Sequence, residues 1–244
     1  MRPRHDDPEL PDDVTPRDLD GAARVELKTL AKDNAEIVAR HLVMAARLID
    51  EDPELAHRHA MSAERRAGRV AIVRETVAIT AYAKGDFALA LRELRTYRRI
   101  SGRDDQLPLM VDSERGVGRP ERALELGRSV DRTTLPNAVQ ASLAIAMSGA
   151  RLDLGQPELA LAELEVPQLD PKVAYPWSPA LFRAYADVLD ELGRAEDARL
   201  WWQRAEHAEA ALAEAEADDE HETVEIIELD EEDEGSDGVV PDAE

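Results

Sequence analysis

The sequence predicts an all-α protein, a right-handed superhelical solenoid of about five helical hairpins. The first observation is an alanine that recurs at steps of 34, 33, 37 and 38 residues. Its copies are Ala56, Ala90, Ala123, Ala160 and Ala198. A fixed period of this length indicates a repeat architecture in which each unit is one helix–turn–helix element.

Two further observations mark the turn inside each unit. Glycines stand five residues before four of the alanines, at Gly85, Gly118, Gly155 and Gly193, with Glu51 in the first copy. Prolines stand two residues after the glycine position in three copies, at Pro53, Pro120 and Pro157. Glycine adopts the left-handed conformation that ends a helix, and proline is tolerated at the first helical position. The pattern therefore places one helix end and one helix start in each copy.

The elements follow in order along the chain. Residues 1–18 are rich in Pro and Asp, and we expect them to be disordered. A solenoid with a C-terminal capping helix is predicted for residues 19–217, and a disordered acidic tail for residues 218–244. The expected helices are 19–30, 33–49, a helix from 53, 70–84, 86–101, 104–116, 119–130, 136–154, 157–165, a helix from 178, and a helix from 194 to about 217.

Residues 37–210 resemble the tetratricopeptide repeat family. The last copy carries the family's large and small core residues at Phe182, Tyr185, Ala186, Leu189, Ala198, Trp202 and Ala205. The resemblance implies that Trp202 is a core residue and that Trp201 lies at the surface. Glu114, in the third copy, departs from the pattern because a bulky residue is usual there.

The resemblance also implies that the first helix of each hairpin lines a concave groove. The candidate groove residues are His41, Ala45, Glu75, Ile79, Tyr82, Asp112, Arg115, Ile145, Arg183 and Asp187. Relatives that clamp a carboxylate use Lys, Arg and Asn in this register, and that set is missing here. We expect the groove to hold an apolar peptide or helix with basic residues at one end, or simply to be filled by packing.

The net charge of −23 is placed unevenly. Residues 208–244 contain 17 acidic residues and no Lys or Arg, whereas residues 1–207 contain 36 acidic and 30 basic residues. Such an acidic block is typical of a solvated interaction tail. A nearly neutral body disfavours nucleic-acid binding, which requires a basic surface.

One local basic cluster remains within the body, between Arg92 and Arg103. Its candidate patch residues are Arg92, Arg95 and Arg99. Three interpretations are open: a solvated face paired with Glu93 and Glu64, a landing site for an anion such as the acidic tail, and a nucleic-acid contact.

An apolar run interrupts the acidic tail at Val224, Ile226 and Leu229. A β-branched run flanked by charge is typical of a peptide that adds a strand to the edge of a sheet. The run also resembles peptides that bind small ubiquitin-like modifiers. The other interpretation is an unstructured segment with incidental apolar residues.

No motif for catalysis, cofactor or metal binding is present in the sequence. There is no cysteine, and His57 and His59 are spaced so that they point to different faces of a helix. His41 lies in an apolar helix, where packing is the more common role. No apolar run is long enough to cross a membrane, and the N-terminus lacks the apolar core of a signal sequence. We therefore expect a cytoplasmic, non-enzymatic protein.

These observations favour a scaffold that binds a protein or peptide in its groove. The alternatives are a regulatory protein whose acidic tail is the active element, as a ligand mimic or autoinhibitor, and a nucleic-acid-associated factor that uses the basic cluster. Arg outnumbers Lys by 26 to 4, which is typical of a GC-rich genome. We therefore expect a bacterial protein. The sequence does not indicate the partner, the pathway or the oligomeric state.

Overall fold

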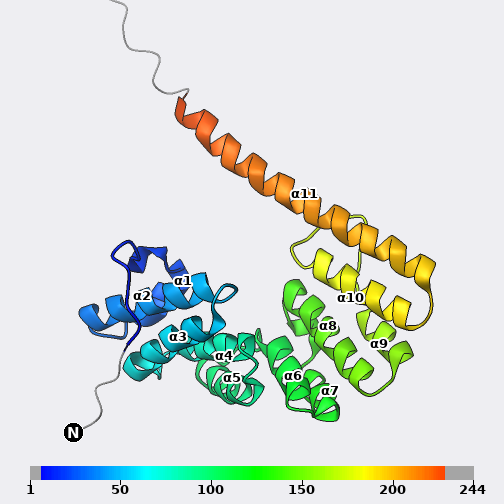
Figure 1. Ribbon diagram of the computed structural model, residues 1–244, viewed down its shortest axis with the longest axis horizontal. Coiled ribbons are helices and arrows are strands. Elements are labelled where there is room, and N and C mark those ends of the chain that lie inside the picture. The colour runs from blue at the N-terminus through cyan, green and yellow to red at the C-terminus, as the bar shows by residue number, and fades with distance from the viewer. Residues whose placement is uncertain (1–6, 229–244) are drawn as a thin grey trace, which may run out of the picture.

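The computed structural model describes the backbone of residues 7–228 and the side chains of residues 7–217 (Figure 1). Over these residues the chain is helical and contains no strand, so the prediction of an all-α protein is confirmed. The α-helices are α1 (Gly21–Leu27), α2 (Lys32–Leu48), α3 (Pro53–Ala67), α4 (Ala71–Ala83), α5 (Phe87–Ser101), α6 (Leu107–Gly116), α7 (Pro120–Gly127), α8 (Asn137–Asp153), α9 (Pro157–Leu164), α10 (Ser178–Glu191) and α11 (Ala195–Glu228). Short 3-10 helices span Pro16–Asp18 and Arg132–Thr134.

Consecutive helices pack in pairs, and the pairs follow one another along an arch (Figure 1). The pairs are α2 with α3, α4 with α5, α6 with α7, α8 with α9 and α10 with α11, and the second helix of each pair contacts the first helix of the next. This repeat-like arrangement places α2, α4, α6, α8 and α10 in equivalent positions. The short helix α1 precedes the first pair and contacts α2 and α4.

The turns inside four of the pairs use the predicted glycines. Gly85, Gly118, Gly155 and Gly193 have φ angles between 67° and 81°, in the left-handed region that favours glycine. The alanines of the repeat lie at the helix contacts as expected. Ala56, Ala90, Ala123, Ala160 and Ala198 are all fully buried.

The N-terminal segment differs from its prediction, because residues 7–18 pack on the first helix pair instead of being disordered. Val14 is 1% exposed. The Arg40 guanidinium on α2 donates to the carbonyl oxygens of Leu10, Pro11 and Val14 at 3.3, 2.8 and 2.8 Å. Asp7 forms ion pairs with two arginines of α3. One buried side chain and a few charged contacts therefore order a segment whose composition is typical of disorder.

The C-terminal helix also differs from its prediction. Helix α11 buries side chains against α10 as far as Ala208, and among the side chains described beyond that residue only Leu212 is even partly buried. Figure 1 shows this extension projecting past the end of α10, so it does not cover the end of the stack. The backbone is helical to Glu228, beyond the expected end near residue 217.

The two tryptophans of α11 are placed the opposite way to what the family resemblance implied: Trp201 is packed and Trp202 is at the surface. The Trp201 ring packs edge-on against Phe182 and Tyr185, at centroid distances of 5.3 and 4.8 Å. Trp202 is 36% exposed, and its Nε1–H donates to Asp187 at 3.0 Å. A shift of one residue turns a helical side chain by about 100°, so a small error in register is enough to exchange the two faces.

Candidate functional site

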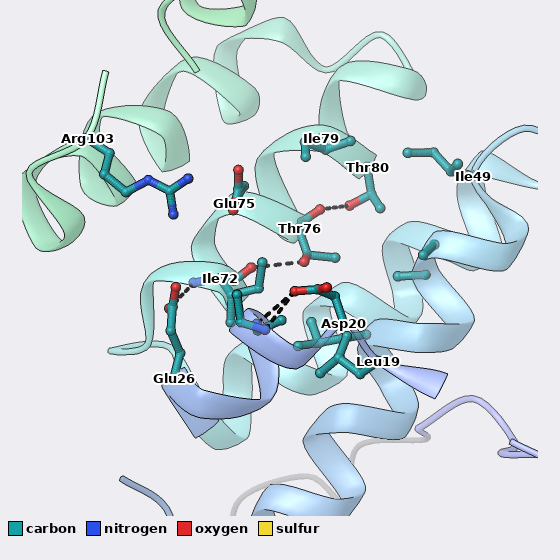
Figure 2. Close-up of a pocket in the computed structure, with 15 residues that line it drawn as sticks. Leu19, Asp20, Glu26, Ile49, Ile72, Glu75, Thr76, Ile79, Thr80 and Arg103 are labelled. Carbon is teal, nitrogen blue, oxygen red and sulfur yellow. Dashed lines mark hydrogen bonds between the residues drawn. The ribbon is translucent and has the colours of Figure 1, made fainter. Parts of the chain in front are cut away.

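A cavity of about 490 Å³ lies between α1, α2 and α4 (Figure 2). Three of the predicted groove residues, Ala45, Glu75 and Ile79, line it together. The other lining residues are Leu19, Asp20, Ala22, Ala23, Glu26, Leu42, Ala46, Ile49, Ile72, Thr76, Thr80 and Arg103. The volume falls within the range of sites that bind small molecules.

Two carboxylates build the wall that α1 contributes to this cavity, which we call the α1–α2–α4 cavity. Asp20 caps α1 by accepting the N–H groups of Ala22 and Ala23 at 2.8 and 3.3 Å. At the other end of α1, Glu26 accepts the N–H of Ile72 at 2.9 Å. The first turn of a helix has unpaired N–H groups, so a carboxylate at that place stabilises α4 and holds α1 against it.

Most of the lining is aliphatic. Leu42 and Ala45 are buried at the base, and Ile49, Ile72 and Ile79 are half-buried around it. The Thr76 hydroxyl donates to the Ile72 carbonyl of its own helix at 2.9 Å, which reduces its polarity toward the cavity. An aliphatic chain that enters the cavity would thus lose contact with water and gain contact with these side chains.

Glu75 is the carboxyl group that stands within this aliphatic surface. Its side chain is half-buried, and Oε1 accepts a hydrogen bond from the Gln106 amide at 2.7 Å. Burial raises the pKa of the Glu75 carboxyl above its usual value, although the Gln106 hydrogen bond and the charge of Arg103 act in the opposite direction. The charged form is therefore poorly solvated, as expected for a carboxylate that is only partly compensated.

A second cavity of about 370 Å³ lies between α6 and α8, the equivalent first helices of the next pairs. Asp112, Arg115 and Ile145, three more of the predicted groove residues, line it with Pro108, Leu109, Ser142 and Ala146. The predicted residue Tyr82 of α4 joins this group by donating its hydroxyl to Asp112. Burial and this hydrogen bond raise the pKa of Tyr82 to about 12, so the phenol remains a donor.

Arg115 ties this second surface together. Its Nε donates to Asp153 Oδ2 at 2.8 Å, and its Nη1 donates to Asp112 Oδ1 at 2.5 Å. Gly149 makes room for the guanidinium, because a Cβ at this position would lie 2.3 Å from Nη1. The charges of Asp112 and Arg115 are thus paired with each other and with α8, unlike that of Glu75.

His41, predicted to line the groove, is instead buried between α2 and α3. It is 1% exposed, and its Nδ1 lies 2.9 Å from Nδ1 of His59. Burial and the charge of His59 lower the pKa of His41 to about 4. His41 is therefore not among the residues that line the α1–α2–α4 cavity, and its partner His59 lines a separate hollow of about 530 Å³ together with residues of the N-terminal segment.

The two predicted residues on α10 also face elsewhere. Arg183 forms an ion pair with Glu209, and Asp187 accepts the Trp202 hydrogen bond, so both side chains contact α11. They attach the last helix and are not brought together with the two cavities.

The basic cluster is largely neutralised by carboxylates beneath it. Arg92 donates to Glu93 at 2.8 Å and Arg95 donates to Glu114 at 2.8 Å, where Glu93 and Glu114 are 2% and 3% exposed. Glu114 therefore occupies a core position as a paired charge. Arg99 is exposed and makes no ion pair with the described residues. These contacts correspond to the solvated, paired face among the three interpretations.

The predicted tail motif falls at the limit of the structure. Val224 and Ile226 lie in the last turns of α11, where the backbone is helical and not extended as strand addition requires. Leu229 lies outside the described residues.

The residues that the structure describes contain no group of three or more His, Asp or Glu side chains arranged to hold a metal ion. Within the same limits, none of the helices combines the length and the apolar character needed to cross a membrane. Neither a comparison with models of known protein families nor a comparison with curated proteins gives a match for this sequence.

Sequence reasoning found the part of the cavity that lies on the first helices of the pairs and missed the rest. Asp20 is the N-cap of α1, Glu26 lies within α1, and Arg103 belongs to the connection between α5 and α6. None of the three is in the repeat register. The N-cap position of Asp20 before an apolar segment was the one available signal that α1 would be fixed in place.

Proposed function

We propose that this protein is a tetratricopeptide-like, non-enzymatic scaffold of the cytoplasm that binds a peptide segment of another protein on the side lined by α2, α4, α6 and α8. The observation that carries the proposal is the α1–α2–α4 cavity of about 490 Å³ with its aliphatic lining. A second cavity on the equivalent helices α6 and α8 extends the concave surface along the stack. An extended or helical peptide could contact both.

The energetic support comes from burial. Aliphatic side chains that enter the cavity are stabilised by about 25 cal/mol for each Å² removed from water. Peptide-recognition grooves commonly use a few apolar anchors of this kind and leave orientation to polar groups at the ends. The paired arginines of the cluster around Arg92 give no comparable support for a nucleic-acid contact, because their charges are already compensated.

The test is a selection of peptides from a random library displayed on phage, with the full-length protein as bait. Ala46→Phe would fill the cavity from an exposed position of α2, and Ala88→Phe would add the same ring at an exposed position of α5. We expect selected peptides to bind the wild type and Ala88→Phe equally and to lose at least about tenfold in affinity for Ala46→Phe. Equal binding to both variants would contradict the proposal.

A further inference from the structure

The charges around the α1–α2–α4 cavity are mostly negative. Asp20, Glu26 and Glu75 line it together with one base, Arg103. Asp20 and Glu26 are engaged with the N–H groups of α1 and α4, respectively. Glu75 is the acid that stands among aliphatic side chains away from a helix end, so it is the group that an incoming charge would meet.

Arg103 forms no ion pair with Glu75. Its guanidinium forms an ion pair with Asp105, and its side chain is 60% exposed. Figure 2 shows the guanidinium of Arg103 directed toward Glu75 without a hydrogen bond between them. The neutral amide of Gln106 is the group that donates to Glu75. A carboxylate that has lost water and gained one neutral donor is stabilised when a cation arrives.

The aliphatic surroundings restrict what kind of cation can reach this carboxylate. Ile72 and Ile79 lie before and after Glu75 on the side of α4 that lines the cavity, and Ile49 lines it from the C-terminal cap of α2. The stems of Lys and Arg are apolar and pack along such surfaces while the charged end finds its partner. Arginine can in addition donate two parallel hydrogen bonds to a carboxylate.

Charge also excludes the chain's own C-terminal region as the occupant. Residues 208–244 carry 17 acidic residues and no Lys or Arg, and they would be repelled by the three acids of the cavity. Arg92 and Arg95 of the basic cluster are no better suited, since Glu93 and Glu114 already pair with them.

We propose, on the basis of the function proposed above, that the occupant of the α1–α2–α4 cavity is a peptide segment of a partner protein that places an Arg or Lys side chain on Glu75 and flanks it with aliphatic side chains. The basic side chain fixes the register of the peptide, and the aliphatic side chains on either side of it fill the cavity.

The experiment is a double-mutant cycle with peptides from the random library that need the cavity for binding. Each peptide is synthesised with its basic residue and with Gln in that place, and each is titrated against wild-type protein and Glu75→Gln. We expect the peptide change to lower affinity for the wild type about tenfold and to have little effect on Glu75→Gln, which is the signature of direct coupling. Glu121→Gln, an exposed position on α7, removes the same charge away from the cavity and should leave affinity unchanged.

Stability measurements keep a loss of binding apart from a loss of folding. The amide that replaces the carboxylate in Glu75→Gln retains an oxygen for the Gln106 hydrogen bond and removes a poorly solvated charge. This variant should therefore melt at the same temperature as the wild type or higher. A lower melting temperature would contradict the description of Glu75 as an under-compensated carboxylate.

The outcomes separate the two proposals. Both proposals are supported if peptides lose affinity for Ala46→Phe and if their basic residue is energetically coupled to Glu75 in the double-mutant cycle. Cavity-dependent peptides that lack a basic residue, or that lose nothing when it is replaced, overturn this inference and leave the scaffold function standing. A library that yields no peptide sensitive to Ala46→Phe overturns the scaffold function and this inference with it.

Discussion

The two ends of the described chain are both rich in acidic residues, yet one is packed and the other projects. Residues 7–18 are rich in Pro and Asp, and the part of α11 beyond Ala208 is rich in Ala and Glu. The first is held by the buried side chain of Val14 and by Arg40, whereas in the second Leu212 is the one side chain, among those described, that is even partly buried. The comparison teaches that a few specific contacts, and not average composition, decide whether a terminal segment is packed.

The largest change in stability that tests this comparison should appear when the pH is lowered. It should arise from protonation of His41, which pairs with His59 near the N-terminal segment. His41 has a folded-state pKa of about 4 and an ordinary value of 6.5, so its contribution to stability is complete above pH 6.5 and is lost as the pH falls toward 4. The loss should reach about 3 kcal/mol for this one group. Urea denaturation at a series of pH values measures it.

The same titration identifies the group responsible. Asp7 faces the pair and favours protonation of His41, while Arg65, Arg66 and the second histidine oppose it. In His41→Gln the fall in stability between pH 6.5 and 4 should be much smaller than in the wild type. An unchanged slope in that window would assign the effect to other groups.

The second effect concerns the anchor of the N-terminal segment. Val14→Ala removes buried methyl groups from a side chain that is 1% exposed, and it should lower the free energy of unfolding by about 1–2 kcal/mol. Val173→Ala makes the same change in another non-helical segment at a side chain that is 43% exposed, and it should cost less than about 0.5 kcal/mol. If the two changes lowered the free energy of unfolding equally, Val14 would not be the residue that anchors the N-terminal segment.

A smaller effect is expected at the charged end of the same segment. Burial alone would raise the pKa of Asp7, but hydrogen bonds from Arg65, Ser62 and Arg66 outweigh it and lower the value to about 2. Its contribution is therefore present above pH 3.8 and is lost as the pH falls toward 2. Asp7→Asn should lower stability at neutral pH by about 1 kcal/mol, because the pair is partly exposed to solvent. Asp12→Asn, at an exposed neighbouring position, is the control that should change nothing.

The smallest effect should be found at the other end of the chain. Ala213→Pro interrupts α11 in its projecting part, and the free energy of unfolding of the whole protein should change by less than about 0.5 kcal/mol. Far-ultraviolet circular dichroism should nevertheless show a loss of helix. Ala205→Pro, at a fully buried contact with Phe182, should lower stability by about 3 kcal/mol or more. Comparable destabilisation by both changes would mean that the projecting part is packed after all.

The sequence was most informative where the structure repeats. The left-handed glycines and the buried alanines follow directly from their spacing, because both depend on local backbone geometry and close helix contact. The same register brought Ala45, Glu75 and Ile79 to one cavity. Position along a helix determines which face a side chain occupies, so these predictions needed no knowledge of distant parts of the chain.

The remainder depended on contacts between distant residues. His41 was assigned to the groove, but it lies on the side of α2 that meets His59 of α3. Helix α1 forms one wall of the cavity because Glu26 accepts a hydrogen bond from the N–H of Ile72, which lies 46 residues later in the chain. Composition likewise did not distinguish Val14, an apolar residue among Pro and Asp, from a residue of a disordered segment.

The four glycine turns have a consequence for how such a chain can change over evolutionary time. A Cβ added at Gly85, Gly118, Gly155 or Gly193 would meet no atom within 4 Å, so the cost of replacing each glycine is confined to its own backbone angle. Each turn is thus independent of the side chains in neighbouring hairpins. A gene segment that encodes one hairpin carries its own turn with it, and the duplication or loss of one unit leaves every other turn intact.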